Sequence, residues 1–222
     1  EQLAEHQQCP VAVGMRYGNP STASALTALA SRSEIEEVVI LPLYPHYARS
    51  SYETAVAFVF EEAKRLQLRP LRFLLTPAFY DDPSYRAVLA EHVREHLPET
   101  FDKLIVSMHG IPTSHIPAPC RAHNGDTSHC LDRAHWHQEH GEADCYRLQC
   151  ETTRHTPADD LILPQRQVEL VYQSRLGFHT WLKPYMSRRI GQFVPEGSEH
   201  LVVVCPGFVC DCLETIQEID DY

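Results

Sequence analysis

The strongest constraint on the fold is the alternation of short apolar segments with segments of helical periodicity. The apolar segments are rich in β-branched residues, which is typical of strands buried on both faces. They span 11–17, 37–44, 71–76, 103–109, 168–173 and 201–205. Helices are predicted over 20–31, 51–66, 82–97 and from about residue 211 onward. This order predicts an α/β protein in which parallel sheets are flanked by helices.

Ligand sites in such folds lie beyond the carboxyl ends of the parallel strands. Polar or aromatic side chains stand at several of these predicted ends: Tyr17, Tyr44, His109, Ser174 and Phe208. The pattern therefore predicts a binding site along this edge of the sheets. The sequence has no GxGxxG or GxxxxGK[ST] motif, so no local motif supports a nucleotide ligand.

Composition limits the class of protein. With 222 residues, 43% of them hydrophobic and 22% charged, the chain can form one large or two small domains with a packed core. Its formal net charge of −11 argues against a nucleic-acid partner, because phosphate binding needs basic patches. Residues 1–8 are polar, and no apolar run has the ~20 residues of a membrane-spanning helix. We expect a cytoplasmic protein, with peripheral membrane association as an alternative.

A histidine ends the predicted strand 103–109 and is followed by Gly-Ile-Pro. Imidazole titrates near neutral pH and binds transition metals, so His109 is a candidate for proton transfer and for metal binding. The alternative is a histidine that only makes a hydrogen bond at the end of a strand.

Three acidic residues follow the last predicted strand with helical spacing. Asp211, Glu214 and Glu218 stand three and four residues apart, so they would share one face of a helix. A row of carboxylates offers oxygen ligands to a divalent cation, or a path for protons. Acids in a first turn also complement the helix dipole, and this alternative is favoured for Asp211 but less for Glu218.

Aromatic and basic side chains are combined over residues 173–185. Trp181 and Tyr185 stand near Arg175 and Lys183, a combination that can hold a flat aromatic ligand and pair with its carboxylates. A strand end followed by a packed helix would explain the same residues. Similar groups occur in the first half of the chain: Arg16, Tyr17, Tyr44 and Tyr47.

Several segments, in this order, strongly resemble the ferrochelatase family. They are GMRYGNPS (14–21), LPLYPHY (41–47), SMHGIP (107–112), QSRLG with WLKPY (173–185) and VVCPGFVCDCLETIQEID (203–220). The resemblance implies two Rossmann-like lobes, residues 1–79 and 80–222, with a porphyrin in the cleft between them. It implies a Cys/His-rich insertion at about 113–150 in the second lobe. It also implies that the family's N- and C-terminal portions are missing, which would leave the first lobe incomplete.

The resemblance further implies roles for individual residues. It places His109 and Glu214 at the family's catalytic positions, and these two with Glu218 and Asp211 on a path for the metal. It places another set around the macrocycle: Arg16, Tyr17, Tyr44, Arg175, Trp181 and Phe208. The implied reaction inserts Fe²⁺ into protoporphyrin IX or coproporphyrin and releases two protons, in haem biosynthesis. The alternatives are an inactive module that binds porphyrin or metal, and a related sirohydrochlorin or cobalt chelatase.

The insertion is rich in cysteine and histidine. Some microbial ferrochelatases carry a [2Fe–2S] cluster on four cysteines at this place, and Cys130, Cys145 and Cys150 resemble three of those positions. Cys120 is a candidate for the fourth ligand. The cysteine pair expected in the middle of the set is replaced by AHWHQEH. A zinc ion on a mixture of cysteine and histidine, or no metal at all, are the alternatives.

Overall fold

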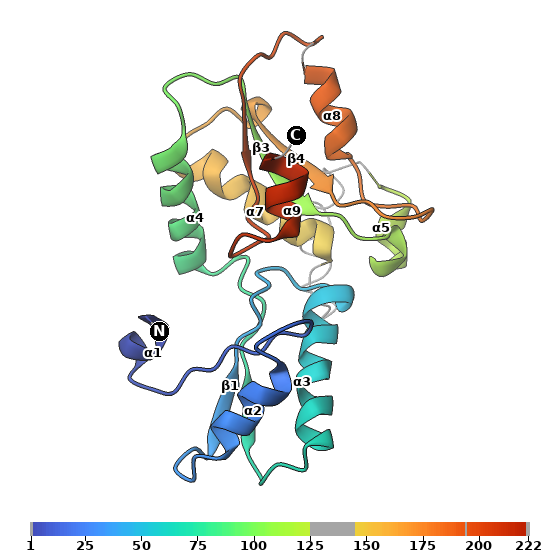
Figure 1. The fold of residues 1–222 in the computed structure, drawn as a ribbon. Helices are drawn as coiled ribbons and strands as arrows, with labels where there is room; N and C mark the ends of the chain where they lie inside the picture. Colours follow the sequence, from blue (N-terminus) through green and yellow to red (C-terminus); the bar gives the residue numbers. More distant parts are fainter. Residues whose placement is uncertain (1, 125–144, 194, 221–222) are drawn as a thin grey trace. The chain divides into compact units, whose positions relative to one another are not determined.

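The computed structural model describes residues 2–124, 145–193 and 195–220, and the chain divides into two compact units (Figure 1). The first unit comprises residues 1–42 and 51–77, and the second comprises 43–50 and 78–222. Each unit contains parallel strands flanked by helices, which confirms the α/β class expected from the alternation. The assignment of residues 1–79 and 80–222 to the two lobes of the family fold stays a prediction.

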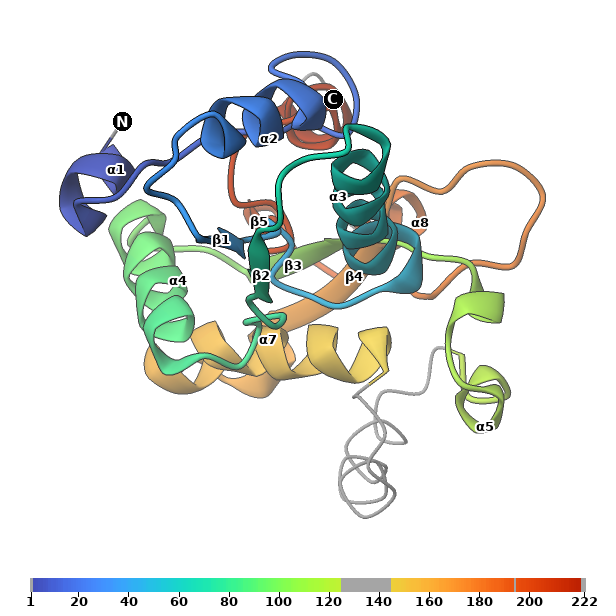
Figure 2. The same cartoon turned by 90° about the horizontal axis from the view of Figure 1, so that it is seen from below.

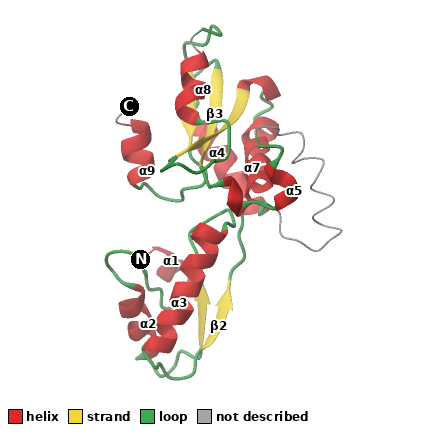
Figure 3. Ribbon diagram, turned by 90° about the vertical axis from the view of Figure 1, so that its right-hand side faces the viewer, coloured by secondary structure: helices red, strands yellow, loops and turns green. Residues whose placement is uncertain are grey.

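The first unit is built around two parallel strands. Its elements are α1 (Gln2–Gln7), α2 (Thr22–Ala30), β1 (Glu37–Ile40), α3 (Thr54–Arg65) and β2 (Arg72–Leu75), and the π-helical turn η1 (Arg49–Glu53) leads into α3. The strands pair from Glu37 opposite Arg72 to Ile40 opposite Leu75. Helix α2 begins at Ser21, whose side chain accepts a hydrogen bond from the backbone N–H of Ser24. Figure 3 shows α2 and α3 alongside this pair of strands.

The predicted strand 11–17 is absent, and this part of the prediction was wrong. Its backbone turns back on itself: Met15 N donates to Pro20 O at 2.8 Å, and Thr22 N donates to Met15 O at 3.2 Å. A strand needs a neighbouring strand to satisfy its backbone groups, and these bonds replace such a ladder. Val13 is 59% exposed, so the apolar residues of this segment do not indicate a buried strand.

The second unit contains a parallel sheet of order β4-β3-β5. Its elements are α4 (Pro83–His96), β3 (Lys103–His109), η2 (Thr113–His115), α5 (Ala118–Arg121), α7 (Tyr146–Asp160), η3 (Gln165–Gln167), β4 (Val168–Gln173), α8 (Met186–Phe193), β5 (Leu201–Val204), α9 (Leu213–Thr215) and the π-helical turn η4 (Ile216–Asp220). Strands β3 and β4 have the predicted bounds. Among the described helices, none has the length and apolarity needed to cross a bilayer.

Alternate residues of β3 face two different layers of helices, as the period of two in a strand requires. Leu104, Val106 and Met108 belong to a core that also includes residues of α4 and α7. Ile105 belongs to a smaller core with residues of α8, among them Phe193. Figure 2 shows α4 and α7 side by side against the sheet. The central strand is therefore covered on both faces, which fits its continuous apolar sequence.

Helix α7 was not predicted from the sequence, because many of its buried side chains are polar. Arg147, Gln149 and Glu151 are almost completely buried, so apolar periodicity does not mark the helix. Gln149 uses its amide group to pair with the backbone of Tyr47: its Oε1 accepts from Tyr47 N at 2.7 Å, and its Nε2 donates to Tyr47 O at 3.1 Å. This pairing attaches residues 43–50 to the second unit.

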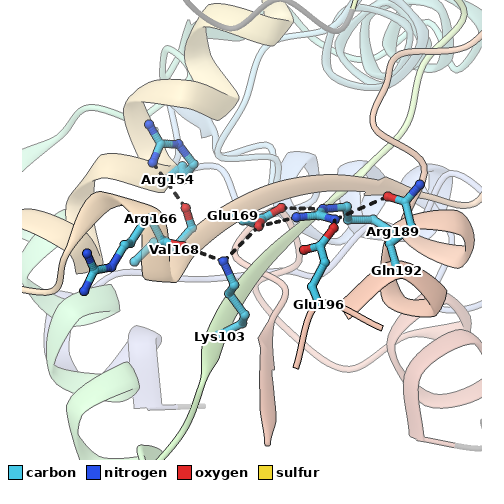
Figure 4. Close-up of polar contacts among 8 residues, drawn as sticks. All are labelled: Lys103, Arg154, Arg166, Val168, Glu169, Arg189, Gln192 and Glu196. Atoms are coloured by element: carbon cyan, nitrogen blue, oxygen red, sulfur yellow. Dashed lines mark hydrogen bonds and ion pairs between the residues drawn. The ribbon is translucent and has the colours of Figure 1, made fainter. Parts of the chain in front are cut away.

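An ion-pair network ties β3, β4 and α8 together on one face of the sheet (Figure 4). Glu169 of β4 accepts two hydrogen bonds of 2.7 Å from Arg189 of α8, and Lys103 of β3 lies 3.2 Å from the same carboxylate. Arg189 also contacts Glu196 at 2.6 Å. Burial opposes ionisation of Glu169, but the hydrogen bonds from Arg189 and Lys103 outweigh it and lower its pKa.

Candidate active site

The register of the sheet brings the ends of its strands to one edge. His109, the last residue of β3, is paired with Gln173, the last residue of β4. Strand β5 ends at Val204, so that residues 205–208 continue from the same edge. Sequence reasoning predicted a site at this edge, and His109 and Phe208 do meet there: their ring centroids lie 6.3 Å apart.

Hydrogen bonds fix the orientation and the tautomer of His109. Its Nδ1 lies 2.6 Å from the carbonyl oxygen of Gly110. A carbonyl only accepts, so Nδ1 carries the proton and the neutral ring has its free lone pair on Nε2. The backbone oxygen of His109 in turn accepts a hydrogen bond of 2.8 Å from the hydroxyl of Tyr146. The half-buried ring is thus oriented so that Nε2 is its hydrogen-bond-accepting nitrogen.

Gly110 is required by the close approach of two strands. A Cβ at this position would lie 2.9 Å from the backbone oxygen of Gln173 and 3.3 Å from the ring of Trp181. The first contact is with backbone and cannot be relieved by rotating a side chain. Gly110 N instead donates to Gln173 O at 2.9 Å. The glycine after His109 therefore allows the backbone of β3 to approach that of β4 closely at the residue that follows the imidazole.

Gln173 of β4 contacts β3, the residue after β5 and α9, and sequence reasoning did not single it out. Its Oε1 accepts from Ser107 Oγ at 2.6 Å and from Cys205 Sγ at 3.6 Å. Its Nε2 donates to the backbone oxygen of Glu214 at 2.8 Å. The sequence did contain a signal for Gln173, because it is a polar residue at the end of an apolar strand. Gln173 positions the Glu214 turn relative to the strand that carries His109.

The acidic residues occupy different places from those expected on a regular helix. Cys212 is the N-cap of α9, so the exposed Asp211 precedes the helix and does not lie in its first turn. The chain continues from α9 into a π-helical turn that contains Glu218, so spacing on an α-helix does not describe the row. Glu218 accepts a hydrogen bond of 2.7 Å from Ser174 Oγ at the end of β4, where Ser174 adopts a φ of 63°.

The four residues expected to bind metal do not form a preassembled chelate. Within the described ranges, no three of His109, Asp211, Glu214 and Glu218 bring their ligand atoms within 4.8 Å of one another. Tight resident metal sites need three or four converging ligands.

The aromatic and basic residues of 173–185 form two groups. In the first group, Trp181 is buried. Its Nε1 donates to Leu176 O at 2.9 Å, and this hydrogen bond joins the two ends of the loop between residues 176 and 181. Arg175, Lys183 and Arg188 surround the ring of Tyr185, at 4.9, 5.9 and 5.7 Å from its centroid. A pocket of about 260 Å³ lies at this basic group.

The candidates from the first half of the chain are distributed over both units. Arg16 and Tyr17 belong to the first unit, where Arg16 donates to Thr54 Oγ1 at 2.6 Å and lies 5.2 Å from the centroid of the Tyr17 ring. The Tyr17 side chain is largely exposed. Tyr44 belongs to segment 43–50 of the second unit and is partly exposed.

The cysteines expected to hold a cluster are only partly described. Cys130 lies outside the described residues, while Cys120, Cys145 and Cys150 belong to the large core of the second unit. The thiols of these three do not converge within 4.8 Å as a group of three. Burial raises the pKa of the Cys150 thiol in the metal-free chain. Because Cys130 and several histidines of the insertion lie outside the described residues, the ligand set expected for a cluster or zinc ion stays a prediction.

Comparison with known proteins assigns a family to this architecture. The family model described as ferrochelatase matches residues 1–222. A curated ferrochelatase from Porphyromonas gingivalis is 40% identical over 222 residues, covering 98% of this chain and 61% of the relative. Ferrochelatases from Pseudomonas savastanoi and Pseudomonas fluorescens are 37% and 35% identical, and the chain spans 61% and 64% of their lengths. The chain thus spans about three-fifths of the length of these curated relatives.

Proposed function

Because this chain belongs to the ferrochelatase family, we propose that it inserts Fe²⁺ into a porphyrin, with release of two protons, in haem biosynthesis. The observation that carries the proposal is the state of His109. Its Nδ1–H is committed to Gly110 O, so Nε2 is the atom that can accept a proton at the edge of the sheet. A positioned imidazole is the commonest base for proton transfer near neutral pH.

Metal insertion requires that pyrrole protons be accepted and that protons or the cation be relayed, and residues at this edge of the sheet are proposed for both. The two inner pyrrole N–H groups must lose their protons as the metal binds, and His109 Nε2 is the proposed first acceptor. Glu214 and Glu218, set on the turn that Gln173 and Ser174 hold, are the proposed relay for protons or for the incoming cation. Their lack of a three-ligand chelate supports this role, because a residue that delivers a metal must also release it.

The ring must also be held in a form whose nitrogen lone pairs face the metal. Phe208, 6.3 Å from His109 between ring centroids, is the proposed wall beside the base. Trp181 is buried beneath Gly110, and we propose that it positions the 175–180 connection that contacts the macrocycle. Arg175 is exposed and is the proposed partner of a porphyrin carboxylate. Arg16, Tyr17 and Tyr44 remain proposed porphyrin contacts.

The direct test is metal insertion by the purified chain. Fe²⁺ under anaerobic conditions, or Zn²⁺ as a fluorescent reporter, is mixed with protoporphyrin IX and with coproporphyrin, and formation of the metalloporphyrin is followed. Turnover of either porphyrin supports the proposal and shows which one is preferred. Porphyrin binding without insertion would instead identify a binding module, a second candidate because the chain spans only part of its relatives' length.

Two finer properties are proposed with the function. Peripheral association of a cytoplasmic protein with a membrane surface is supported by Leu176 and Phe178, which are 74% and 108% exposed beside Arg175. A [2Fe–2S] cluster or zinc ion on Cys120, Cys130, Cys145 and Cys150 is proposed from the resemblance of the insertion, with Cys130 outside the described residues. Vesicle flotation tests the first property. Iron, acid-labile sulfide and zinc analysis of anaerobically purified protein tests the second.

A further inference from the structure

Two histidines and a glutamate form a separate cluster at the end of α4. His92, Glu95 and His96 stand at positions i, i+3 and i+4, so they share one face of the helix. All three are exposed, and one potential ligand atom from each lies within 4.8 Å of the others. It is the one such group of three within the residues that the structure describes.

The hydrogen bonding of the cluster leaves a metal-binding nitrogen free. His96 Nδ1 lies 2.8 Å from the backbone oxygen of His92, so Nδ1 is the donor and Nε2 holds the lone pair. Metal-binding histidines commonly use this arrangement, in which a backbone carbonyl fixes the ring through its other nitrogen. The two rings are 4.4 Å apart between centroids and tilted by 44°.

A pocket beside the cluster provides room for further ligands. It has a volume of about 190 Å³, and both histidines line it together with Val93, Leu104 and residues 202–204 of β5. Water molecules or a small ligand in this space can occupy the coordination positions that three side chains leave open. The pocket makes the cluster accessible to a fourth ligand from the sheet side as well as from solvent.

The cluster is remote from the candidate active site. Leu104 lies near the start of β3 and His109 at its end, five residues further along. At roughly 3.3 Å per residue, the two ends are about 16 Å apart along the strand. The pocket beside the cluster therefore lies toward the start of β3, and neither it nor the cluster includes a residue proposed for porphyrin metallation.

We propose that His92, Glu95 and His96 bind a divalent first-row transition metal ion. Two imidazole nitrogens and one carboxylate oxygen suit Zn²⁺, Fe²⁺ and their neighbours, whereas Mg²⁺ and Ca²⁺ prefer oxygen-only sites. The helix presents the ligands without a change of backbone, and their exposure lets the ion enter from solvent.

Calorimetric titration with Zn²⁺, in a buffer that contains a non-chelating reductant, tests the proposal. The quantity compared is the Zn²⁺ stoichiometry and affinity of the unchanged chain and of its variants. The chain has 14 histidines and 8 cysteines, so other sites contribute to the total. His92→Ala and His96→Ala should each remove one bound equivalent or weaken that site at least about 10-fold, since they remove a direct ligand. Glu95→Gln should weaken it less. His6→Ala, an exposed histidine on α1, is the matched control and should titrate like the unchanged chain.

A second readout locates the ion. Cu²⁺ or Ni²⁺ added below one equivalent should broaden the amide NMR signals of residues 90–97, and His96→Gln should abolish that broadening. His96→Gln keeps a polar side chain at an exposed position, so the far-ultraviolet circular dichroism should not change. Equal Zn²⁺ stoichiometry and affinity in all variants, with no broadening in α4, would overturn the proposal.

Discussion

At the scale of single residues, the arrangement around His109 separates positioning from chemistry. Gly110 and Tyr146 satisfy the side-chain Nδ1 and the backbone oxygen of His109, which leaves Nε2 as its reactive atom. Gly110 also allows the backbone contact with Gln173 that a Cβ would block. The neighbours of His109 therefore position the ring, and proton transfer at Nε2 is the role proposed for it.

His109→Ala should lower the rate of metal insertion by at least about 100-fold, in the range expected for loss of a general base. Porphyrin binding, read by quenching of tryptophan fluorescence, should change much less, because the substitution removes only one of the side chains proposed to contact the macrocycle. His115→Ala, at an exposed histidine of η2, is the control and should keep its activity. Near-normal turnover of His109→Ala would contradict the assignment.

His46 gives the folded protein a specific sensitivity to acid. It is buried, and burial lowers its pKa from 6.5 to about 3. The Thr153 hydroxyl donates to Gln149 O, so it accepts from His46 Nε2 at 2.7 Å, and burial keeps the ring neutral. The unfolded chain binds a proton below pH 6.5 and the folded chain does not, so stability must fall as the pH drops from about 6.5 towards 3.

His46→Gln should flatten this dependence. The wild-type chain should lose up to about 1.4 kcal/mol of unfolding free energy per pH unit through this residue, and the variant should lack that contribution. Urea unfolding at several pH values between 7 and 5 measures both slopes. His179→Gln, at an exposed histidine, should keep the wild-type slope. Parallel slopes for His46→Gln and the wild type would show that His46 is not the group responsible.

At the scale of elements, the turn from α9 into η4 places two acids on the sheet edge and leaves a third outside. Gln173 binds the backbone of Glu214, and Ser174 binds the carboxylate of Glu218. Asp211 precedes the N-cap Cys212 and is exposed. The elements thus distinguish three acids that looked alike in the sequence.

Glu214→Gln should reduce metal insertion far more than Asp211→Asn, by about 10-fold or more against little change. The proposed relay needs a group that ionises, which glutamine lacks, whereas Asp211 lies outside the turn that Gln173 and Ser174 hold. Steady-state rates with Zn²⁺ and a porphyrin measure both variants, and melting temperatures control for stability. Equal and mild losses of activity that follow equal losses of melting temperature would mean that both acids only stabilise the turn.

The ion-pair network of Figure 4 should be worth more than an exposed ion pair. Glu169→Gln keeps the shape of the side chain but removes the charge that Arg189 and Lys103 share, at an expected cost of about 1–3 kcal/mol at pH 7. Glu91→Gln, which breaks an exposed pair with Arg94 on α4, should cost less than about 1 kcal/mol.

The same network predicts a pH dependence with a defined sign. The pKa of Glu169 is lowered in the folded chain, so its contribution is present above the usual value of 4.5 and is lost as the pH falls through the folded value. The stability difference between wild type and Glu169→Gln should therefore shrink below about pH 4.5. A difference that stays constant from pH 7 to pH 3 would contradict the charge-based account.

At the scale of the whole molecule, the sequence predicted those parts that burial of apolar residues determines. Strands β3 and β4 were predicted to the residue because both faces are covered, and His109 became a candidate because it ends such a strand. Helix α7 and Gln173 were not found, because both act through buried polar contacts that leave no apolar periodicity. The predicted strand 11–17 failed for the converse reason, since its apolar residues are not buried.

The two units differ in how much structure supports their strands. In the second unit, β3 lies between two strands and contributes to both described cores. In the first unit, the described sheet consists of β1 and β2 alone. Its buried hydrophobic side chains in the described ranges are few: Leu26, Val38, Tyr52 and Val56. A two-stranded sheet is marginal unless other elements cover it, and here α2 and α3 lie alongside it.

Amide hydrogen exchange should therefore show that the first unit opens at lower free energy than the second. The amides of Val38 and Val39 in β1 should exchange at least about 10-fold faster than those of Ile105 and Val106 in β3, because opening exposes less apolar surface there. Val56→Ala should speed exchange in β1 and β2 and leave β3 unchanged, since it removes a buried contact of the first unit only. If Val56→Ala speeds exchange equally in β1 and β3, the two units unfold as one cooperative structure, and their separate stabilities have no meaning in solution.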